Sequence, residues 1–325
     1  MHNVTVIIPN WNGIGFLPDC MSALAAQTYT AFTTVVIDNG STDGSVAWLR
    51  ENCPDITLVE NSENLGFTGA VNQGIAMTQT PYLILLNNDT AVAPGFVGAL
   101  VKAIEASEKI FSVSSRMIQY HDHSKLDDAG DLYNILGWAF QRGVGQSVRR
   151  YRKPGRVFSA CAGAAIYRTR VFDEIGMFDP MHFAYLEDLD VGWRARIHGY
   201  ENRYEPAAVV YHVGSGTSGS KYNHFKVKLA ARNNVYINYK NMPALQRAVN
   251  WLPIRLGQAL KRRFFRKIGF EQDFLEGLAE AKATRKDCRR VPFRWEHLGN
   301  YLRIEGELIA NLFVYTADYL RRKLS

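Results

Sequence analysis

The sequence predicts an α/β fold in which a mainly parallel sheet is flanked by helices, followed by a basic helical region. Short apolar runs alternate with segments of helical spacing early in the chain, which is typical of βαβ units. Polar residues follow each of those runs, and the pattern becomes helical and basic from about residue 222. We therefore expect a sheet-based domain over residues 1–241 and a helical region over residues 242–325.

The predicted strands and helices of the first part alternate strictly. β-Branched and aliphatic residues predict strands over residues 4–9, 34–38, 56–59 and 82–86. Apolar residues at helical spacing predict helices over residues 17–26, 45–51 and 69–77. In such a sheet, ligands bind beyond the carboxyl ends of the parallel strands.

The later segments are less regular. Residues 117–156 are rich in Gly, Asp, Arg and Tyr and predict loops with a hairpin, leading to a strand near residues 157–160. A strand over residues 207–212 ends in His212, and the Gly/Ser-rich stretch 214–220 predicts a mobile loop. From Leu245 to Ile268 apolar residues recur every three or four positions among Lys and Arg, which predicts a basic amphipathic helix with a kink or start at Pro253.

Composition excludes several classes of protein. With 325 residues, 47% hydrophobic and 21% charged, the chain resembles an ordinary globular protein. No apolar stretch is long enough for a transmembrane helix, and the start lacks the features of a signal peptide. The four cysteines are scattered without a C-x-x-C pair, so we expect free thiols in a reducing compartment, the cytoplasm.

The net charge of +7 conceals an asymmetry. From Gly219 onward the chain has 22 Lys+Arg and 9 Asp+Glu, or +13, whereas the preceding residues have 16 and 22, or −6. Such a basic region commonly meets phosphates on lipid, nucleic acid or an anionic substrate. Solvated helix faces are the other interpretation of the same charge.

Polar residues mark the ends of the predicted strands. Asn10 and Asn12 follow the first strand, Asp38 ends the second, residues 61–67 follow the third, and Asn87, Asn88 and Asp89 follow the fourth. Because the carboxyl ends of parallel strands meet at one edge, we expect these side chains to share a site. The cluster at 87–89 is either a turn or a seat for a metal ion and its ligand.

An acidic run precedes a helical pattern at residues 185–194. Glu187, Asp188 and Asp190 lie within four positions, and the helix dipole alone accounts for one or two acids in a first turn. A third acid suits a general base at the mouth of a site. His212 at a strand end is more often structural, but beside Asp89 it could join a divalent cation such as Mg²⁺ or Mn²⁺.

Six motifs occur in an order that resembles a known family. They read VIIPNWNG, VIDNGSTDGS, NLGFTGAVNQGI, LLNNDT, IGMFDP followed by YLEDLDVGWRARIHGY, and YHVGSGTS. Together they resemble inverting glycosyltransferase family 2 with the GT-A fold, and most of all its rhamnosyltransferase-like branch, which builds bacterial surface polysaccharides. The resemblance covers roughly residues 4–240 and implies a GT-A domain over residues 1–241.

The resemblance implies roles for individual residues. Asp188 matches the catalytic base, and Asp89 matches the last Asp of the family's D-x-D, which reaches the metal held by the diphosphate. His212 matches a histidine that joins the metal in some members, and Asn87 stands at the first D-x-D position as a weaker ligand. The donor nucleotide would lie against Pro9, Asn10, Asn12, Asp38, Asn64, Gly66, Phe67 and Asn88. Contacts with the acceptor or diphosphate are expected of Glu187, Tyr185, Trp138 and Arg232.

The chemistry of inverting transfer agrees with these residue types. One base must take the proton of the acceptor hydroxyl, and a cation can neutralise the departing nucleoside diphosphate. The departure from the family is Asn87, since an amide is a weaker metal ligand than a carboxylate. We expect dependence on Mg²⁺ or Mn²⁺. The branch suggests dTDP-rhamnose as donor, although base contacts near Asp38 suit uracil and thymine equally.

The basic amphipathic helix after residue 242 has two interpretations. It could lie on the anionic inner face of the plasma membrane, which suits a lipid-linked glycan acceptor. Alternatively, it packs on the body of the protein or forms a homodimer interface.

Rival functions are weaker. A nucleotidyltransferase making nucleotide sugars would present basic residues in the loop after the first strand, and PNWNGIGF has none. A nucleic-acid-binding protein would need a ladder of stacking aromatics or a docking motif, which the basic region lacks, so we expect no nucleic-acid partner. A catalytically dead scaffold is disfavoured by Asp188 and Asp89.

Other residues receive structural interpretations. We expect Trp48 and Trp193 in the core and Asp190 in a salt bridge or at a helix terminus. Asp127, Asp128 and Asp131 resemble a metal cluster by count, but the sequence around them predicts a solvated loop.

Overall fold

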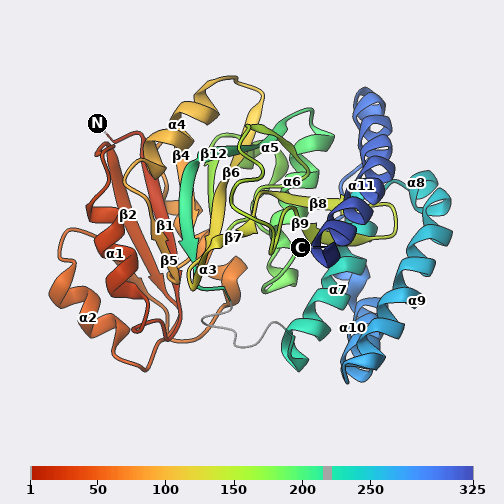
Figure 1. The fold of residues 1–325 in the computed structure, drawn as a ribbon, viewed down its shortest axis with the longest axis horizontal. Coiled ribbons are helices and arrows are strands. Elements are labelled where there is room, and N and C mark those ends of the chain that lie inside the picture. The colour runs from red at the N-terminus through yellow and green to blue at the C-terminus, as the bar shows by residue number, and fades with distance from the viewer. Residues whose placement is uncertain (1, 215–221, 325) are drawn as a thin grey trace.

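The computed structural model describes residues 2–214 and 222–324, so most of the predicted loop 214–220 lies outside the described residues. The first two thirds of the chain form a central sheet with helices on both faces, and the C-terminal helices stand beside one end of that sheet (Figure 1). This arrangement confirms the α/β prediction and the helical C-terminal region.

Within the described residues, the main sheet has ten strands in the order β10-β12-β6-β11-β4-β1-β2-β3, with β5 on β12 and β7 on β6. A separate two-stranded sheet pairs β8 with β9. The strands are β1 Val4–Asn10, β2 Phe32–Asp38, β3 Thr57–Glu60, β4 Tyr82–Leu86, β5 Thr90–Val92, β6 Ile110–Gln119, β7 Asp122–Asp128, β8 Asp131–Asn134, β9 Trp138–Gln141, β10 Gly155–Val157, β11 Ala164–Arg168 and β12 Glu201–His212.

The helices flank this sheet and then continue alone. Those of the sheet region are α1 Leu17–Ala25, α2 Ser45–Asn52, α3 Gly66–Met77, α4 Phe96–Glu105, α5 Val171–Ile175 and α6 Glu187–Ile197. The later helices are α7 His224–Asn241, α8 Ala244–Val249, α9 Trp251–Lys267, α10 Glu271–Thr284 and α11 Leu298–Leu324. Three short 3₁₀ turns complete the set: η1 Pro180–His182, η2 Arg285–Asp287 and η3 Trp295–His297.

The strands β4, β1, β2 and β3 are parallel, which aligns the polar ends predicted from the sequence. Asn10 pairs with Asp38, and Asp38 pairs with Glu60, so these strands end at one edge. β4 (YLILL) is buried along its whole length, as expected for a central strand covered by helices on both faces. Beyond β4 the sheet becomes mixed, because β11 pairs antiparallel with both β4 and β6.

The segment 117–156 differs from its prediction. It holds the hairpin β6–β7 and the pair β8–β9, and the strand expected near 157–160 is β10, which ends at Val157. The prediction of a solvated loop is wrong for two of its aspartates, since Asp128 is 0% exposed and Asp131 is 8% exposed. Both lie inside beside residues 158–161 and Asp188, which are distant in sequence, so local composition does not reveal their burial.

The C-terminal helices share a hydrophobic core with the sheet region. Tyr301, Ile304 and Leu308 of α11 pack with Trp193 of α6 and Tyr133 of β8, which confirms the core position of Trp193. The backbone N–H of Ile135 also donates to the carbonyl of Leu308 at 2.9 Å. Trp48 is only partly buried, at the edge of another core cluster. Among the described helices, none combines the length and apolarity that crossing a membrane requires.

Candidate active site

Hydrogen bonds join three strand ends into one polar edge. The Nδ2 of Asn10 donates to Asp38 at 2.7 Å, and the Nδ2 of Asn88 donates to the Oδ1 of Asn10 at 2.6 Å. All three residues are almost fully buried. The side chains after β1, β2 and β4 therefore form one continuous chain, as the alignment of parallel strands predicts.

The loops after β1 and β2 are held together in the same way. Asn12, with a φ of 49°, accepts from the N–H of Thr42 at 2.9 Å, and its own N–H donates to Ser41. Pro9 lies next to this loop inside β1, opposite Ile37 of β2. The predicted donor residues Pro9 and Asn12 thus border the polar edge.

The start of α3 meets the loop before α6. Gly66 has a φ of 76°, and a Cβ at this position would lie 2.6 Å from the ring of Phe183, so only glycine fits. The carboxamide of Asn64 accepts from the N–H of Gly66 at 2.9 Å. The partly buried ring of Phe67 packs edge-on against Phe178, at the border of a core cluster.

A second polar group lies where β4 passes into β5. The Nε2 of His212 is 3.3 Å from the Oδ1 of Asp89, and its Nδ1 is 2.7 Å from the Oδ2 of Asp127. Burial alone would lower the pKa of His212, but hydrogen bonds to Asp127 and Asp89 outweigh it and raise the pKa to about 10. The carboxylate–imidazole–carboxylate arrangement resembles the outer-shell support of metal-ligating histidines.

One short turn connects the D-x-D equivalent to the predicted base. The carbonyl of Gly163 accepts from the N–H of Asn87 at 2.8 Å. The N–H of the preceding residue, Ala162, donates to the Oδ2 of Asp188 at 3.3 Å. Asn87 and Asp188 are therefore held by adjacent residues of the same turn.

The loop that leads into α6 has a strained backbone. Three non-glycine residues, Phe183, Tyr185 and Leu186, have φ values between 61° and 70°. Asn233 of α7 is fully buried and holds this loop, since its Nδ2 lies within 2.9 Å of the carbonyls of His182, Ala184 and Tyr185. Strain of this kind persists only where surrounding contacts determine it, and it clusters at active sites.

The carboxyl groups at the start of α6 have different surroundings. Burial, joined by the charge of Asp188, raises the pKa of Glu187 to about 8. Burial also raises the pKa of Asp188, while hydrogen bonds from the N–H groups of Ala162 and Leu189 and from the Asp131 side chain lower it. Asp190 is ion-paired with Arg194 at 3.1 Å and Lys240 at 2.8 Å, which confirms its salt-bridge interpretation.

Two predicted acceptor or diphosphate residues have other neighbours. The indole N–H of Trp138 donates to the carbonyl of Gly257 in α9 at 3.1 Å, and its ring meets Tyr315 of α11 edge-on. The guanidinium of Arg232 bonds the carbonyls of Met181 and His182 and forms an ion pair with Glu280. Tyr185 lies in the strained loop and meets Phe225 edge-on.

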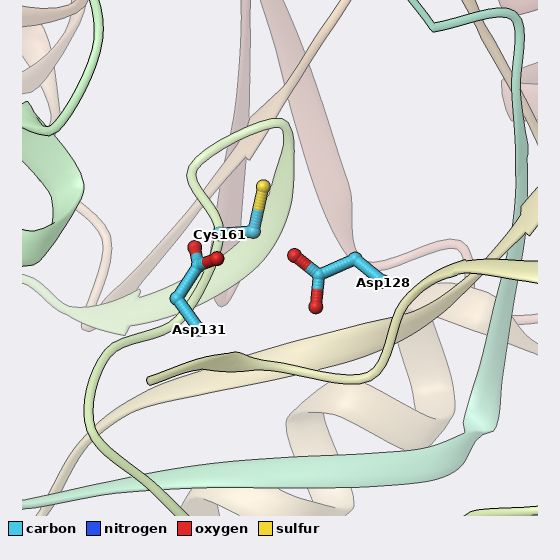
Figure 2. Close-up of side chains that lie close together, drawn as sticks. All are labelled: Asp128, Asp131 and Cys161. Carbon is cyan, nitrogen blue, oxygen red and sulfur yellow. The ribbon is translucent and has the colours of Figure 1, made fainter. Parts of the chain in front are cut away.

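The structure adds residues that the sequence did not assign to the site. Asp127 supports His212, Asn233 holds the strained loop, and Asp128, Asp131 and Cys161 gather together (Figure 2), with Asp188 next to Asp131. The run DDAGD at 127–131 was the available signal. Its burial beside residues 158–161 and Asp188 is a tertiary contact, which sequence spacing does not place.

Comparison with protein families decides the classification. The family model described as Glycosyl transferase family 2 matches residues 5–176 of this chain. The chain belongs to glycosyl transferase family 2. This confirms the resemblance inferred from the six motifs, and the matched range contains the polar edge, Asp89 and the 162–163 turn.

Curated relatives of this family 2 chain make bacterial polymers and lipid-linked sugars. It is 26% identical over 225 residues to the N-acetylglucosaminyl-diphospho-decaprenol L-rhamnosyltransferase of Mycobacterium tuberculosis, covering 61% of this chain and 72% of the relative. It is 22% identical over 222 residues to the poly-beta-1,6-N-acetyl-D-glucosamine synthase of Staphylococcus aureus, covering 67% of this chain but only 52% of the synthase.

Solved structures share the fold. GalNAc-T7 with UDP, GalNAc and Mn²⁺ superposes with a TM-score of 0.59 at 15% identity, covering 73% of this chain and 48% of that one. A mannosyltransferase from Pyrobaculum calidifontis in complex with GDP-Man and Mn²⁺ gives 0.54 at 17% identity, covering 99% and 83%. These glycosyltransferases confirm the GT-A architecture of this family 2 member.

Proposed function

We propose that this family 2 glycosyltransferase moves a sugar from a nucleoside-diphosphate sugar to an acceptor hydroxyl with inversion, and that Asp188 is the general base. The observation that carries the proposal is the 162–163 turn, which bonds Asn87 on one side and Asp188 on the other. A donor diphosphate at the strand ends would therefore present its sugar toward the start of α6. Asp188 must be ionised to take the acceptor's proton, so the rate should rise with pH through its raised pKa.

The polar edge suits the nucleotide of the donor. Asp38, Asn10 and Asn88 are ordered by mutual hydrogen bonds, and Asn64 orders the backbone of Gly66. Pro9 and Asn12 lie beside them, whereas the ring of Phe67 packs against Phe178. The 26% identical rhamnosyltransferase supports dTDP-rhamnose as the first donor to test, in a panel scored by thermal shift, because a bound donor raises the melting temperature.

The group around Asp89 fits a divalent cation. Asp89 offers a carboxylate, and His212, oriented by Asp127, offers its Nε2 once an incoming cation displaces the proton there; such oxygen and nitrogen donors suit Mn²⁺ and, with donor phosphates, Mg²⁺. Asn87 could add its amide oxygen. A cation bound there would neutralise charge on the leaving diphosphate. Two structural neighbours were crystallised with Mn²⁺, which supports this assignment.

The acceptor is proposed to be a lipid-linked glycan used in surface-polysaccharide synthesis. The decaprenol-linked substrate in the name of the mycobacterial relative supports this choice. The face of α8 and α9 supports it independently, because the apolar residues predicted to form one stripe are exposed there, as Leu252 (68%) and Leu256 (54%) illustrate. We propose that this stripe rests on the cytoplasmic face of an anionic membrane.

The Asp188→Asn variant tests the central assignment. It should lower transfer by about 10²- to 10⁴-fold, because the amide cannot accept the acceptor's proton. Donor affinity, measured by calorimetry, should stay near that of the natural chain. The matched control is Asp173→Asn, which removes an exposed carboxylate from the first turn of the neighbouring α5. Transfer at the natural rate by Asp188→Asn would refute the role of base.

A further inference from the structure

A second set of acidic groups lies next to Asp188. Asp128 ends β7, Asp131 begins β8, and Cys161 precedes β11, and Figure 2 shows their side chains converging. Their ligand atoms lie within 4.8 Å of one another. Side-chain hydrogen bonds connect Asp131 with both Asp128 and Asp188. Asp131 is therefore the link between the catalytic carboxyl and a buried one.

The surroundings supply too little positive charge for this many carboxylates. The described ionisable groups that face the cluster from neighbouring elements are Asp127, Tyr167, Asp188, Tyr204 and Arg142, and Glu187 lies next to Asp188. Arg142 is the one cation among them, and it is already engaged by the carbonyl of Ala129 and by the rings of Tyr151 and Tyr204. Like-charged carboxylates packed in a low-dielectric interior cannot all ionise.

The charge imbalance falls most heavily on Asp131. Burial, then the charges of Asp128 and Asp188, raise the pKa of Asp131 well above its usual range. Burial and the charge of Asp127 also raise the pKa of Asp128, to about 7, although Asp128 accepts from the N–H of Gly130 and is favoured by the charge of Arg142. A contact between two bare carboxylates is repulsive, and one proton on Asp131 supplies the donor for one of its two carboxyl contacts.

We propose that Asp131 remains protonated while the enzyme works and donates its proton in a hydrogen bond to the Asp188 carboxylate, which makes Asp131 a positioning residue for the base. This inference rests on the proposed role of Asp188. The donated hydrogen bond favours the ionised form of Asp188 and fixes its orientation. Burial disfavours the ionised form of Asp188, and this hydrogen bond offsets that effect without placing a second negative charge beside the base.

A metal ion held by the same three groups is a weaker interpretation. Burial and the neighbouring carboxyl groups raise the pKa of the Cys161 thiol well above its usual range, and a protonated thiol is a poor ligand. Two carboxylates with a thiol also mix hard and soft donors, which suits neither Mg²⁺ nor a typical thiolate site. A proton on Asp131 supplies a donor for its contact with Asp188 and needs no atom beyond those already present.

Two substitutions distinguish a protonated Asp131 from an ionised one. Asp131→Asn keeps a neutral hydrogen-bond donor, so the midpoint of the acid limb of kcat/KM should stay close to that of the natural chain. Asp131→Ala removes the donor, so the pKa of Asp188 should rise and the midpoint should move up by about one to two pH units. If Asp131 were ionised, both variants would remove a neighbouring negative charge and move the midpoint down, which would overturn the proposal.

A matched control separates this effect from general damage to the site. The hydroxyl of Ser159 donates to the backbone carbonyl of Asp188 at 2.6 Å. Ser159→Ala should leave the midpoint in place, whatever it does to the rate, because it does not touch the carboxyl group. A midpoint that moves equally in Ser159→Ala and Asp131→Ala would show that local packing alone sets it.

A spectrum of the resting protein tests the protonation without turnover. Carbon-13 NMR of the full chain labelled at aspartate carboxyl groups should show a resonance of a protonated acid at neutral pH that is absent from Asp131→Asn. The spectrum can be recorded even if the protein transfers no sugar, so the protonation of Asp131 and the proposed glycosyl transfer can be refuted independently. An Asp131 resonance that titrates in the ordinary aspartate range would refute the inference.

Discussion

At the scale of single residues, asparagine rather than charge organises the strand ends. Asn10 donates to Asp38 and accepts from Asn88, so one neutral side chain connects three strands. An amide can donate and accept at once, which a carboxylate at neutral pH cannot do. The polar edge therefore places only one negative charge, that of Asp38, among these three residues, and leaves Asp89 as the acid nearest the proposed cation.

The metal assignment leads to a residue-level prediction. Asp89→Ala should abolish the cation-dependent transfer, because it removes the carboxylate ligand. Asp127→Asn keeps the ligands but weakens the support of His212, and effects of such outer-shell changes are about 10- to 100-fold in metal affinity. Titrating the transfer rate with Mn²⁺ and Mg²⁺ would measure both variants. Full activity in excess EDTA would contradict a requirement for metal.

Residue-level prediction from the sequence succeeded where strand geometry decides position. His212 was expected to gain a role only if Asp89 lay at a neighbouring strand end, and the two side chains do lie 3.3 Å apart. The pairing of His212 with Thr90 across β12 and β5 brings this about. The burial of Asp128 and Asp131 was missed, since it depends on tertiary contacts with residues 158–161 and Asp188, which local sequence does not reveal. The catalytic roles themselves stay predictions.

At the scale of elements, α7 holds the strained loop and thereby positions α6, the helix that carries the proposed base Asp188. Asn233 bonds three loop carbonyls, and Arg232 bonds two in the same region. The backbone of Phe183 at a φ of 61° is costly unless such contacts hold it. The acidic run and the helical pattern after it predicted the start of α6. The positive φ values of Phe183, Tyr185 and Leu186 could not be predicted, because no glycine occurs at these positions.

Removing the carboxamide of Asn233 tests this positioning. Asn233→Ala removes the side-chain donor from the carbonyls of Ala184 and Tyr185, while that of His182 keeps Arg232, and it should cost about 1–3 kcal/mol of unfolding free energy. It should also slow transfer more than stability alone explains, because the loop sets the direction of α6. The neighbouring Asn234→Ala is the matched control, since Asn234 bonds the carbonyl of Gly137 instead. Urea unfolding and transfer assays of both variants would decide, and equal slowing would contradict the role of the loop.

At the scale of the whole molecule, charge and exposed apolar surface gather in the same region. The C-terminal part carries +13, and α9 displays Leu252, Leu256, Leu260 and Phe264 on one face. The side of α9 that carries Gly257 packs on the β8–β9 turn, since a Cβ at Gly257 would lie 2.0 Å from the carbonyl oxygen of Leu136. The helical prediction for this region was correct, but only the structure shows that its apolar stripe is uncovered by the described chain.

Vesicle flotation tests the membrane proposal. Replacing Leu256 and Leu260 with Glu should abolish flotation with anionic vesicles, because it places charge where apolar contact is needed. Met77→Glu, at an exposed apolar site on α3, is the matched control and should float like the natural chain. If the natural chain does not float but sediments as a dimer that the Leu variants disrupt, the stripe is a homodimer interface. Point substitutions are preferable to a truncation after residue 241, which would strip Tyr301, Ile304 and Leu308 from the core.

The packing of α11 on α6 also determines when the enzyme can finish folding. Roughly a hundred residues separate the end of α6 at Ile197 from Tyr301, which completes the core around Trp193. At about 5–20 residues per second, the ribosome needs roughly 5–20 seconds to make that stretch. During this interval the helix that carries Asp188 has emerged without its covering partner, with an aromatic side chain open to chaperones and to neighbouring nascent chains. The core around Trp193 is therefore completed late in synthesis, after β1 to β4 have been made.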